Sequence, residues 1–236
     1  MKRISLAIAL MTMLVALTTS AEAQTKTKRT TATTSEIASA LKEALTKGVR
    51  FAIDTLGREN GFLDDVRVRI PLPKSLQKLE KGLRVAGQGK AVDEFVESMN
   101  HAAEKAVPVA IDVFTDAIKQ MTFDDARKIL FSGENDSATR FFRRTSEETL
   151  REKFRPIVEK FTSEVGVTQK YKDMIGKGGP FTKMLVGKDA TDLDGYVTQK
   201  ALDGLFFMVA QEEAKIRKDP IGRTTSLLRK VFGMIR

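Results

Sequence analysis

Apolar residues recur at intervals of three and four over most of the chain, and this period constrains the fold more than any other feature. One such stretch covers residues 37–56 and ends at Gly57, and another covers residues 92–121 with Pro108 inside it. Because an α-helix repeats every 3.6 residues, this spacing gathers the apolar side chains on one face. Pro108 is expected to end or kink its helix. The sequence predicts a mostly all-α fold, a single helical bundle-like domain.

The helix predicted over residues 193–217 is the most apolar in the chain. One apolar stripe passes through Leu205 and an adjoining one through Phe206, so the apolar arc is wide. A wide arc predicts burial on more than one side, which places this helix at the centre of the bundle. Gly204, in its middle, costs a helix about 1 kcal/mol relative to Ala. We interpret Gly204 as a point where a neighbouring backbone passes close by.

One stretch departs from the helical period. Apolar and basic residues alternate over Val66–Ile70, and Pro71-Leu72-Pro73 follows. A period of two with prolines beside it predicts a minor extended or short β element near residues 66–70. Such an element either pairs with a segment that the sequence does not reveal or lies extended over helices.

Hydroxyl residues followed three positions later by a carboxylate predict helix N-termini. The hydroxyl accepts a hydrogen bond from a backbone N–H of the first turn, and the carboxylate accepts one from the cap residue. The pairs are Thr122 and Asp125, Thr145 and Glu148, and Thr191 and Asp194.

The first 34 residues are not expected to belong to the domain. Lys2 and Arg3 precede an apolar run of about 14 residues, and Ala21-Glu22-Ala23 follows, which is the layout of a signal peptide. A membrane span needs roughly 20 apolar residues, so an anchor is disfavoured. We expect a signal peptide over 1–23, a polar flexible linker over 24–34 and one helical domain over 35–236. The mature protein would begin at Gln24 and be periplasmic or secreted.

Composition excludes several classes of function. The chain has no Cys, which rules out disulfides, a cysteine nucleophile and cysteine-ligated metal sites. Its formal charge of +9 is spread too thinly to indicate a nucleic-acid surface. Export argues further against DNA as a partner and against ATP-driven chemistry. We therefore expect no cofactor, no nucleic-acid partner and no transmembrane span in the mature chain.

Several blocks resemble a known family. They are Arg69–Pro73, Gln120–Arg127 (QMTFDDAR), Phe141–Thr145 (FFRRT), Phe154–Val158 (FRPIV), Tyr196–Phe206 (YVTQKALDGLF) and Lys230–Gly233. Together they make the chain similar, from about Ser35 to Gly233, to an uncharacterised bacterial family named domain of unknown function 4197. The resemblance implies an exported, mostly helical protein. It supplies no catalytic residues to transfer to this chain.

The candidate ligand-binding residues come from two stretches of the sequence. An arginine cluster lies beside Phe141, Phe142 and Phe154, and polar residues interrupt the apolar helix over 193–217. The candidates are Arg140, Arg143, Arg144, Arg151, Arg155, Tyr196, Gln199, Lys200 and Asp203. Polar groups on a buried helix must be paired. One interpretation is a buried Arg–Asp network that fixes the register of the helices, with Asp203 paired to an arginine. The other is a recessed cationic pocket for an anionic or amphipathic ligand.

Other patterns predict no site. His101, the single histidine, is interpreted as a surface residue, and no nucleophile motif accompanies it. The segment Gly82–Lys90 lacks the Ser or Thr that a phosphate loop needs. Asp189, Asp192 and Asp194 precede Gly195 in the manner of a calcium loop, but Ala201 stands where that loop needs Glu.

We therefore expect a non-enzymatic binding or interaction protein, with two alternatives. A carboxylate-dependent enzyme of the cell envelope would use Asp124, Asp125 or Asp203 as acid or base, and it needs two converging carboxyl groups, one with a raised pKa. A membrane-surface protein would use the amphipathic C-terminal helix over 224–236. We favour packing of that helix on the bundle.

Overall fold

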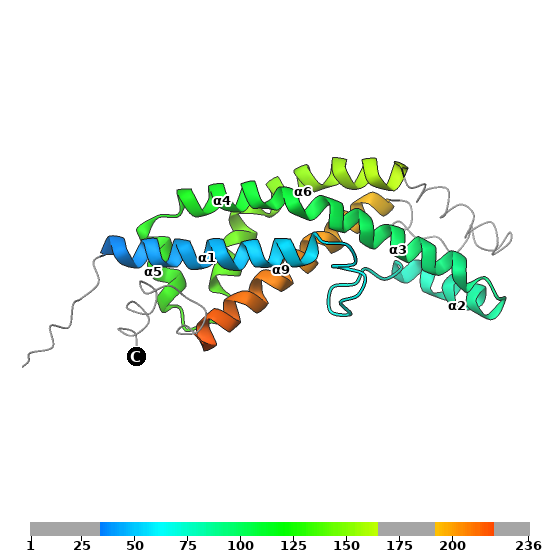
Figure 1. Cartoon of the computed structure of the whole chain (residues 1–236), viewed down its shortest axis with the longest axis horizontal. Coiled ribbons are helices and arrows are strands. Elements are labelled where there is room, and N and C mark those ends of the chain that lie inside the picture. The colour runs from blue at the N-terminus through cyan, green and yellow to red at the C-terminus, as the bar shows by residue number, and fades with distance from the viewer. Residues whose placement is uncertain (1–33, 165–191, 220–236) are drawn as a thin grey trace, which may run out of the picture. The chain divides into compact units, whose positions relative to one another are not determined.

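The structure of the protein, a computed structural model, describes residues 34–164 and 192–219, which fall within one compact unit (Figure 1). The helices, in chain order, are α1 (Thr34–Leu56), the 3-10 turn η1 (Lys74–Leu76), α2 (Gln77–Val85), α3 (Gly89–Ala106), the 3-10 turn η2 (Val107–Val109), α4 (Ala110–Gln120), α5 (Phe123–Phe131), α6 (Ser137–Glu164) and α9 (Leu193–Lys218). The predicted all-α fold is confirmed, and these two ranges contain no strand.

Helix α9 is buried on several sides, as its wide apolar arc predicts. It packs against α6, α1 and α3, and its side chains Leu205 and Phe206 are almost fully buried. The ring of Phe114 on α4 contacts two further rings edge-on, at centroid distances of 5.0 Å to Phe142 on α6 and 6.0 Å to Phe206. Edge-to-face contacts of this kind add about 0.5–1.5 kcal/mol to the burial of the rings. They join α4, α6 and α9 in one core.

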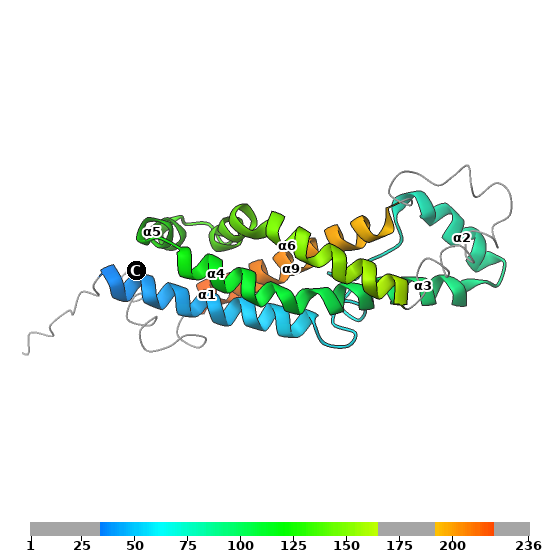
Figure 2. The ribbon, with the colours of Figure 1, turned by 90° about the horizontal axis from the view of Figure 1, so that it is seen from above.

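Pro108 separates α3 from α4 as predicted. The proline lies in η2, a single 3-10 turn, and Figure 1 shows α3 and α4 continuing one another on either side of it. Helix α1 runs alongside α4, where the two helices are in contact (Figure 2). The turn at Pro108 therefore lets one stretch of apolar sequence contact both α6 and α1.

The Val66–Ile70 segment is not a strand. Residues 66–68 form a turn in which Val66 is 86% exposed, and the chain from Arg69 to Pro73 is extended over the helices. The side chain of Asn100, fully buried on α3, makes the two backbone hydrogen bonds that a strand partner would make. Its Oδ1 accepts the Ile70 N–H at 2.8 Å, and its Nδ2 donates to the Ile70 carbonyl at 3.0 Å. An amide side chain thus replaces the missing strand.

The structure confirms one of the capping predictions and contradicts another. Thr122 and Asp125 form the predicted box at the start of α5, each accepting from the other's backbone N–H at 3.1 Å. The prediction at Thr145 is wrong, because α6 is already in progress there and the Thr145 hydroxyl donates to the Phe141 carbonyl one turn earlier. Phe142, before the supposed cap, is fully buried. Its burial favours a continuous helix over a start at Thr145. Thr191 lies outside the described residues.

Gly204 does mark a close approach, but of a side chain rather than a backbone. A Cβ at this position would lie 2.6 Å from Cε1 of Phe62 and 3.4 Å from Cβ of Val68. Phe62 has no exposed surface, so its ring has little room to move. The glycine on α9 therefore gives the 57–73 segment its place in the core.

We expect Gly204→Ala to destabilise the protein by about 1–3 kcal/mol, because the new methyl group overpacks the site of Phe62. The free energy of unfolding in urea measures this. Gly82→Ala is the matched control, since nothing lies within 4 Å of its added Cβ and Ala is the better helix former. Gly82→Ala should stabilise the fold slightly. Equal effects of the two substitutions would contradict the packing argument.

The turn that carries Phe62 is held by a buried carboxylate on α3. Glu104 accepts the backbone N–H groups of Asn60, Phe62 and Leu63 at 3.2, 3.0 and 3.3 Å. His101 is partly exposed at 26%, as the interpretation of a surface residue allows, but it is also tied into the turn, because its Nδ1 lies 2.7 Å from Glu104 Oε2. Burial lowers the pKa of His101, but the hydrogen bonds and charges of Glu104 and Glu97 outweigh it, and the net shift is upward.

This shift predicts a pH dependence of stability. The pKa of His101 in the folded protein lies above the 6.5 of an unfolded chain, so protonated His101 stabilises the fold fully below about pH 6.5. That contribution disappears as the pH rises through the folded pKa. The difference in unfolding free energy between the wild type and His101→Gln should therefore be larger at about pH 5.5 than at about pH 9. A difference that stays constant with pH would show that the histidine charge contributes nothing.

Candidate functional site

A recess of about 820 Å³ opens between α6, α9 and the chain around η1, and we call it the basic recess. Its walls include Arg151, Arg155, Tyr196, Gln199 and Lys200, five of the nine residues that the sequence singled out. Lys74 adds a fourth cation, and Asp192 is the only carboxylate among the described residues that line the recess. Four positive groups thus face one negative group in a concave site.

The packing of α6 on α9 creates this convergence. Arg151 and Arg155 are four residues apart and therefore share one face of α6. Tyr196 and Lys200 stand at the same spacing on α9, and the Lys200 ammonium lies 6.0 Å from the centroid of the Tyr196 ring. The Tyr196 hydroxyl donates to the Pro71 carbonyl at 2.9 Å, which holds the extended chain against the recess.

A chain of polar contacts links α6 to α9 at one side of the recess. Arg151 donates to Oε1 of Gln199 at 2.6 Å, and Nε2 of Gln199 donates to Asp203 at 3.0 Å. The predicted Arg–Asp ion pair is wrong, because Gln199 stands between the two groups. Asp203 lies outside the lining of the recess, is 43% exposed, and has Lys200 at 3.7 Å as its cation.

Two carboxylates hold Arg155 beside the N-terminus of α9. Its guanidinium lies 2.8 Å from Glu159 and 3.3 Å from Asp192, and these partners raise its pKa, the hydrogen bond with Glu159 most. Asp192 is the N-cap of α9 and accepts the Gly195 N–H at 2.9 Å. The cap is therefore Asp192 rather than the predicted pair, and Asp194 instead accepts from the Thr162 hydroxyl at 2.6 Å.

The remaining arginines of the candidate set serve other places along α6. Arg140 pairs with Glu134 and Asp136 near the start of the helix, at 2.9 and 2.8 Å. Arg143 lies over the ring of Phe206, 4.5 Å from its centroid, and covers the edge of the core. Arg144 lines a different recess. Sequence proximity therefore overestimates the cluster, because 16 residues of helix span about 24 Å.

That other recess, of about 460 Å³, lies between α4 and α6. Asp112, Asp116 and Asp125 line it together with Arg144 and Lys153. The hydroxyl and N–H of Thr122 hydrogen-bond the carboxylate of Asp125 and lower its pKa, which is opposite to the shift that a general acid needs. Asp124 is exposed and does not line the recess.

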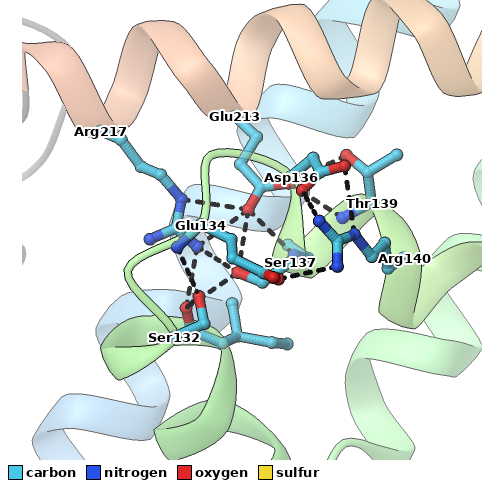
Figure 3. A network of polar contacts seen from close by, with 10 residues as sticks. Ser132, Glu134, Asp136, Ser137, Thr139, Arg140, Glu213 and Arg217 are labelled. Atoms are coloured by element: carbon cyan, nitrogen blue, oxygen red, sulfur yellow. Dashed lines mark hydrogen bonds and ion pairs between the residues drawn. The ribbon is translucent and has the colours of Figure 1, made fainter.

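A polar network at the start of α6 looks like a site but is structural (Figure 3). Glu213 of α9, only 6% exposed, accepts the N–H groups of Ala138 and Thr139 at 2.9 Å each. Arg217 donates to Glu213 at 2.8 Å and to the Ile129 carbonyl of α5 at 2.8 Å. Glu213 thus caps α6 from another helix, where the first N–H groups have no intrahelical partner.

Sequence reasoning missed Glu213, Lys74 and Glu104. Glu213 and Arg217 have the spacing of an ion pair on one helix face, and Glu213 follows Val209 on the apolar side of α9. This pattern in the sequence could have indicated a buried ion pair. Lys74 has no such signal, because only the tertiary fold brings η1 to α6. In the two described ranges, no group of three or more His, Asp or Glu is placed to hold a metal ion.

The described helices include none with an apolar stretch long enough to cross a membrane. The C-terminal segment 224–236 and the signal peptide and linker predictions fall outside the described residues.

Fold and site together define an all-helical protein with a basic recess between two closely packed helices. The chain belongs to the family described as "Protein of unknown function (DUF4197)", which matches residues 31–233. This confirms the resemblance seen in the sequence blocks. Comparisons with curated proteins and with solved structures gave no match.

The role of Glu213 as the cap of α6 predicts how much this residue contributes to the free energy of unfolding. Glu213→Ala should destabilise the protein by about 3–5 kcal/mol, because it leaves two buried helix N–H groups without an acceptor and removes the carboxylate that neutralises Arg217. Chemical unfolding measures the loss. Glu134→Ala is the control from the same network, since its ion pair with Arg140 is half exposed and should contribute at most about 1 kcal/mol. Similar losses in the two variants would show that Glu213 does not cap α6.

Proposed function

We propose that the protein is a non-enzymatic binding protein whose basic recess holds an anionic ligand. The observation that carries this proposal is the convergence of Lys74, Arg151, Arg155 and Lys200 on one concave site against the single carboxylate of Asp192. Cations gathered in a recess attract an anion more strongly than the same cations spread over a convex surface, because field lines are focused there.

The states of three of the four cations support binding rather than a purely structural role, whereas Arg155 is paired with Glu159 and Asp192. Lys74 has no ion-pair partner among the described residues, and Lys200 is 3.7 Å from its partner Asp203. Arg151 makes its shortest contact with the neutral amide of Gln199. An arriving anion therefore meets positive charge that local carboxylates only partly neutralise. Its oxygens would accept charge-assisted hydrogen bonds from the guanidinium and ammonium groups.

The ring of Tyr196 and the side chain of Leu72 give the recess an apolar side. Binding sites commonly combine such apolar walls with a few placed polar groups. An amphipathic anion fits this mixture, with its charged end at the arginines.

A carboxylate-dependent enzyme is less well supported. The α4–α6 recess brings three aspartates together, but the lowered pKa of Asp125 does not suit a proton donor. The export inferred from the signal-peptide pattern supports a ligand met in the periplasm or outside the cell. That localisation belongs to the proposal, as does the alternative in which residues 224–236 bind a membrane surface.

Binding of ethyl phosphate, followed by calorimetry at low salt, tests the proposal. The double variant Lys74→Gln/Arg155→Gln should weaken binding at least about tenfold, since each hydrogen bond to a charged group contributes about 1.5–3 kcal/mol. The control Lys78→Gln/Lys160→Gln removes the same charge from α2 and α6 outside the recess and should change affinity less than about twofold. Absence of binding by the wild type, or equal losses in both double variants, would refute the proposal.

A further inference from the structure

A second recess of about 460 Å³ adjoins the basic recess and shares Arg151, Arg155 and Gly195 with it. Its charge balance is reversed. Three glutamates, Glu148, Glu152 and Glu159, line it against the same two arginines. We call this the acidic recess. The two arginines therefore lie at a boundary, with an excess of positive charge on one side and an excess of negative charge on the other.

The acidic recess also contains a hydroxyl that the fold leaves unpaired. Thr198 lines it from α9, and the residue is 98% buried. Its Oγ1 has no hydrogen-bond partner among the described residues. A buried hydroxyl without a partner costs about 1–3 kcal/mol, and Val would fill the same space without that cost. The unpaired hydroxyl at this recess therefore points to a polar ligand group that approaches it.

Glu152, an exposed residue of α6, lines the same recess. Its carboxylate has no cation partner in the part of the chain that the structure describes, whereas Glu148 and Glu159 contact Arg151 and Arg155. Its carbonyl lacks the usual helical donor, because that donor would be the N–H of residue 156, which is a proline. A carboxylate and a freed carbonyl on one residue suit a cationic hydrogen-bond donor such as an ammonium group.

We infer that the ligand of the basic recess is a small zwitterion, whose anionic group lies at Arg155 and whose ammonium group lies at Glu152. This inference rests on the proposed function. Arg155 and Glu152 are three residues apart on α6, so their Cβ atoms are about 5–6 Å apart. A short molecule with a phosphate or carboxylate at one end and an ammonium at the other spans that interval.

Single-charge ligands fit the boundary less well. A plain anion leaves Glu152 without a partner, and a plain cation meets the arginines. A zwitterion pairs with both groups at once, and the second contact then forms at high effective concentration. The approach of its polar end to Thr198 supplies the partner that the hydroxyl lacks.

O-phosphoethanolamine, ethyl phosphate and ethanolamine are the probes that separate these cases, with calorimetry on the full chain. O-phosphoethanolamine should bind at least about tenfold more tightly than ethyl phosphate, and ethanolamine should not bind measurably. If ethyl phosphate binds equally well and still depends on Arg155, the zwitterion inference is wrong and the proposed function stands. If no probe binds, both fail.

Two variants test the acidic recess itself. Glu152→Gln should reduce the preference for O-phosphoethanolamine over ethyl phosphate to less than about threefold. Glu164→Gln, on the same helix outside both recesses, should leave the preference unchanged. Thr198→Val should weaken binding of O-phosphoethanolamine at least about threefold while the melting temperature stays the same or rises. A fall in melting temperature with unchanged affinity would assign Thr198 to the core and overturn its part in the site.

The same chemistry occurs in free metabolites and in lipid headgroups, and vesicles distinguish these sources. Binding of free O-phosphoethanolamine with no sedimentation on phosphatidylethanolamine vesicles supports a soluble zwitterion. Sedimentation on those vesicles that Glu152→Gln abolishes supports a headgroup. Equal sedimentation on phosphatidylglycerol vesicles, insensitive to Glu152→Gln, would refute recognition of a zwitterion.

Discussion

The burial of α9 is the constraint on which the rest of the structure depends. This helix contacts α1, α3 and α6, so a polar group buried on it needs a hydrogen-bond partner from the protein or from a ligand. Glu213 finds its partners in the first turn of α6 and in Arg217, and Gln199 finds them in Arg151 and Asp203. These contacts also fix where α6 lies along α9. The positions of the basic recess and the acidic recess follow from that register.

Apolar periodicity predicted the fold because helix burial depends mainly on which face is apolar. It identified α9 as central, and it identified Gly204 as a point of close approach. It gave the wrong neighbour at Gly204, since the contact comes from Phe62 in a segment with no helical period. In the same segment the extended alternative of the prediction holds from Arg69 to Pro73, and the short β element does not form. Alternation describes only the side chains, whereas the backbone partner of Ile70 is an amide on a distant helix.

The sequence predicted which residue types form the candidate site, but it overestimated how many of the arginines reach it. Arg151 and Arg155 reach the basic recess, whereas Arg140 and Arg143, of the same residue type on the same helix, pair with local carboxylates or cover Phe206. Chemistry alone cannot separate these arginines. Their distance along α6 separates them, since each residue advances about 1.5 Å along the helix. Lys74 could not be included because no local pattern brings η1 to α6.

Two features of the acidic recess leave hydrogen-bonding capacity unused, and of the two buried side-chain hydroxyls without a partner among the described residues, Ser75 and Thr198, only Thr198 lines this recess. Glu104 and Glu213 are buried, and both have saturated carboxylates. Asn100 uses both ends of its amide. Against that background, Thr198 keeps a hydroxyl without a partner, and Pro156 removes a donor one turn from Glu152. Val in place of Thr198 and a good helix former in place of Pro156 would each stabilise the packed pair of helices if no ligand bound there. Natural chains depart from local rules where function requires it. Both departures line the recess that borders the two arginines, which is where a ligand of mixed charge would restore the missing hydrogen bonds.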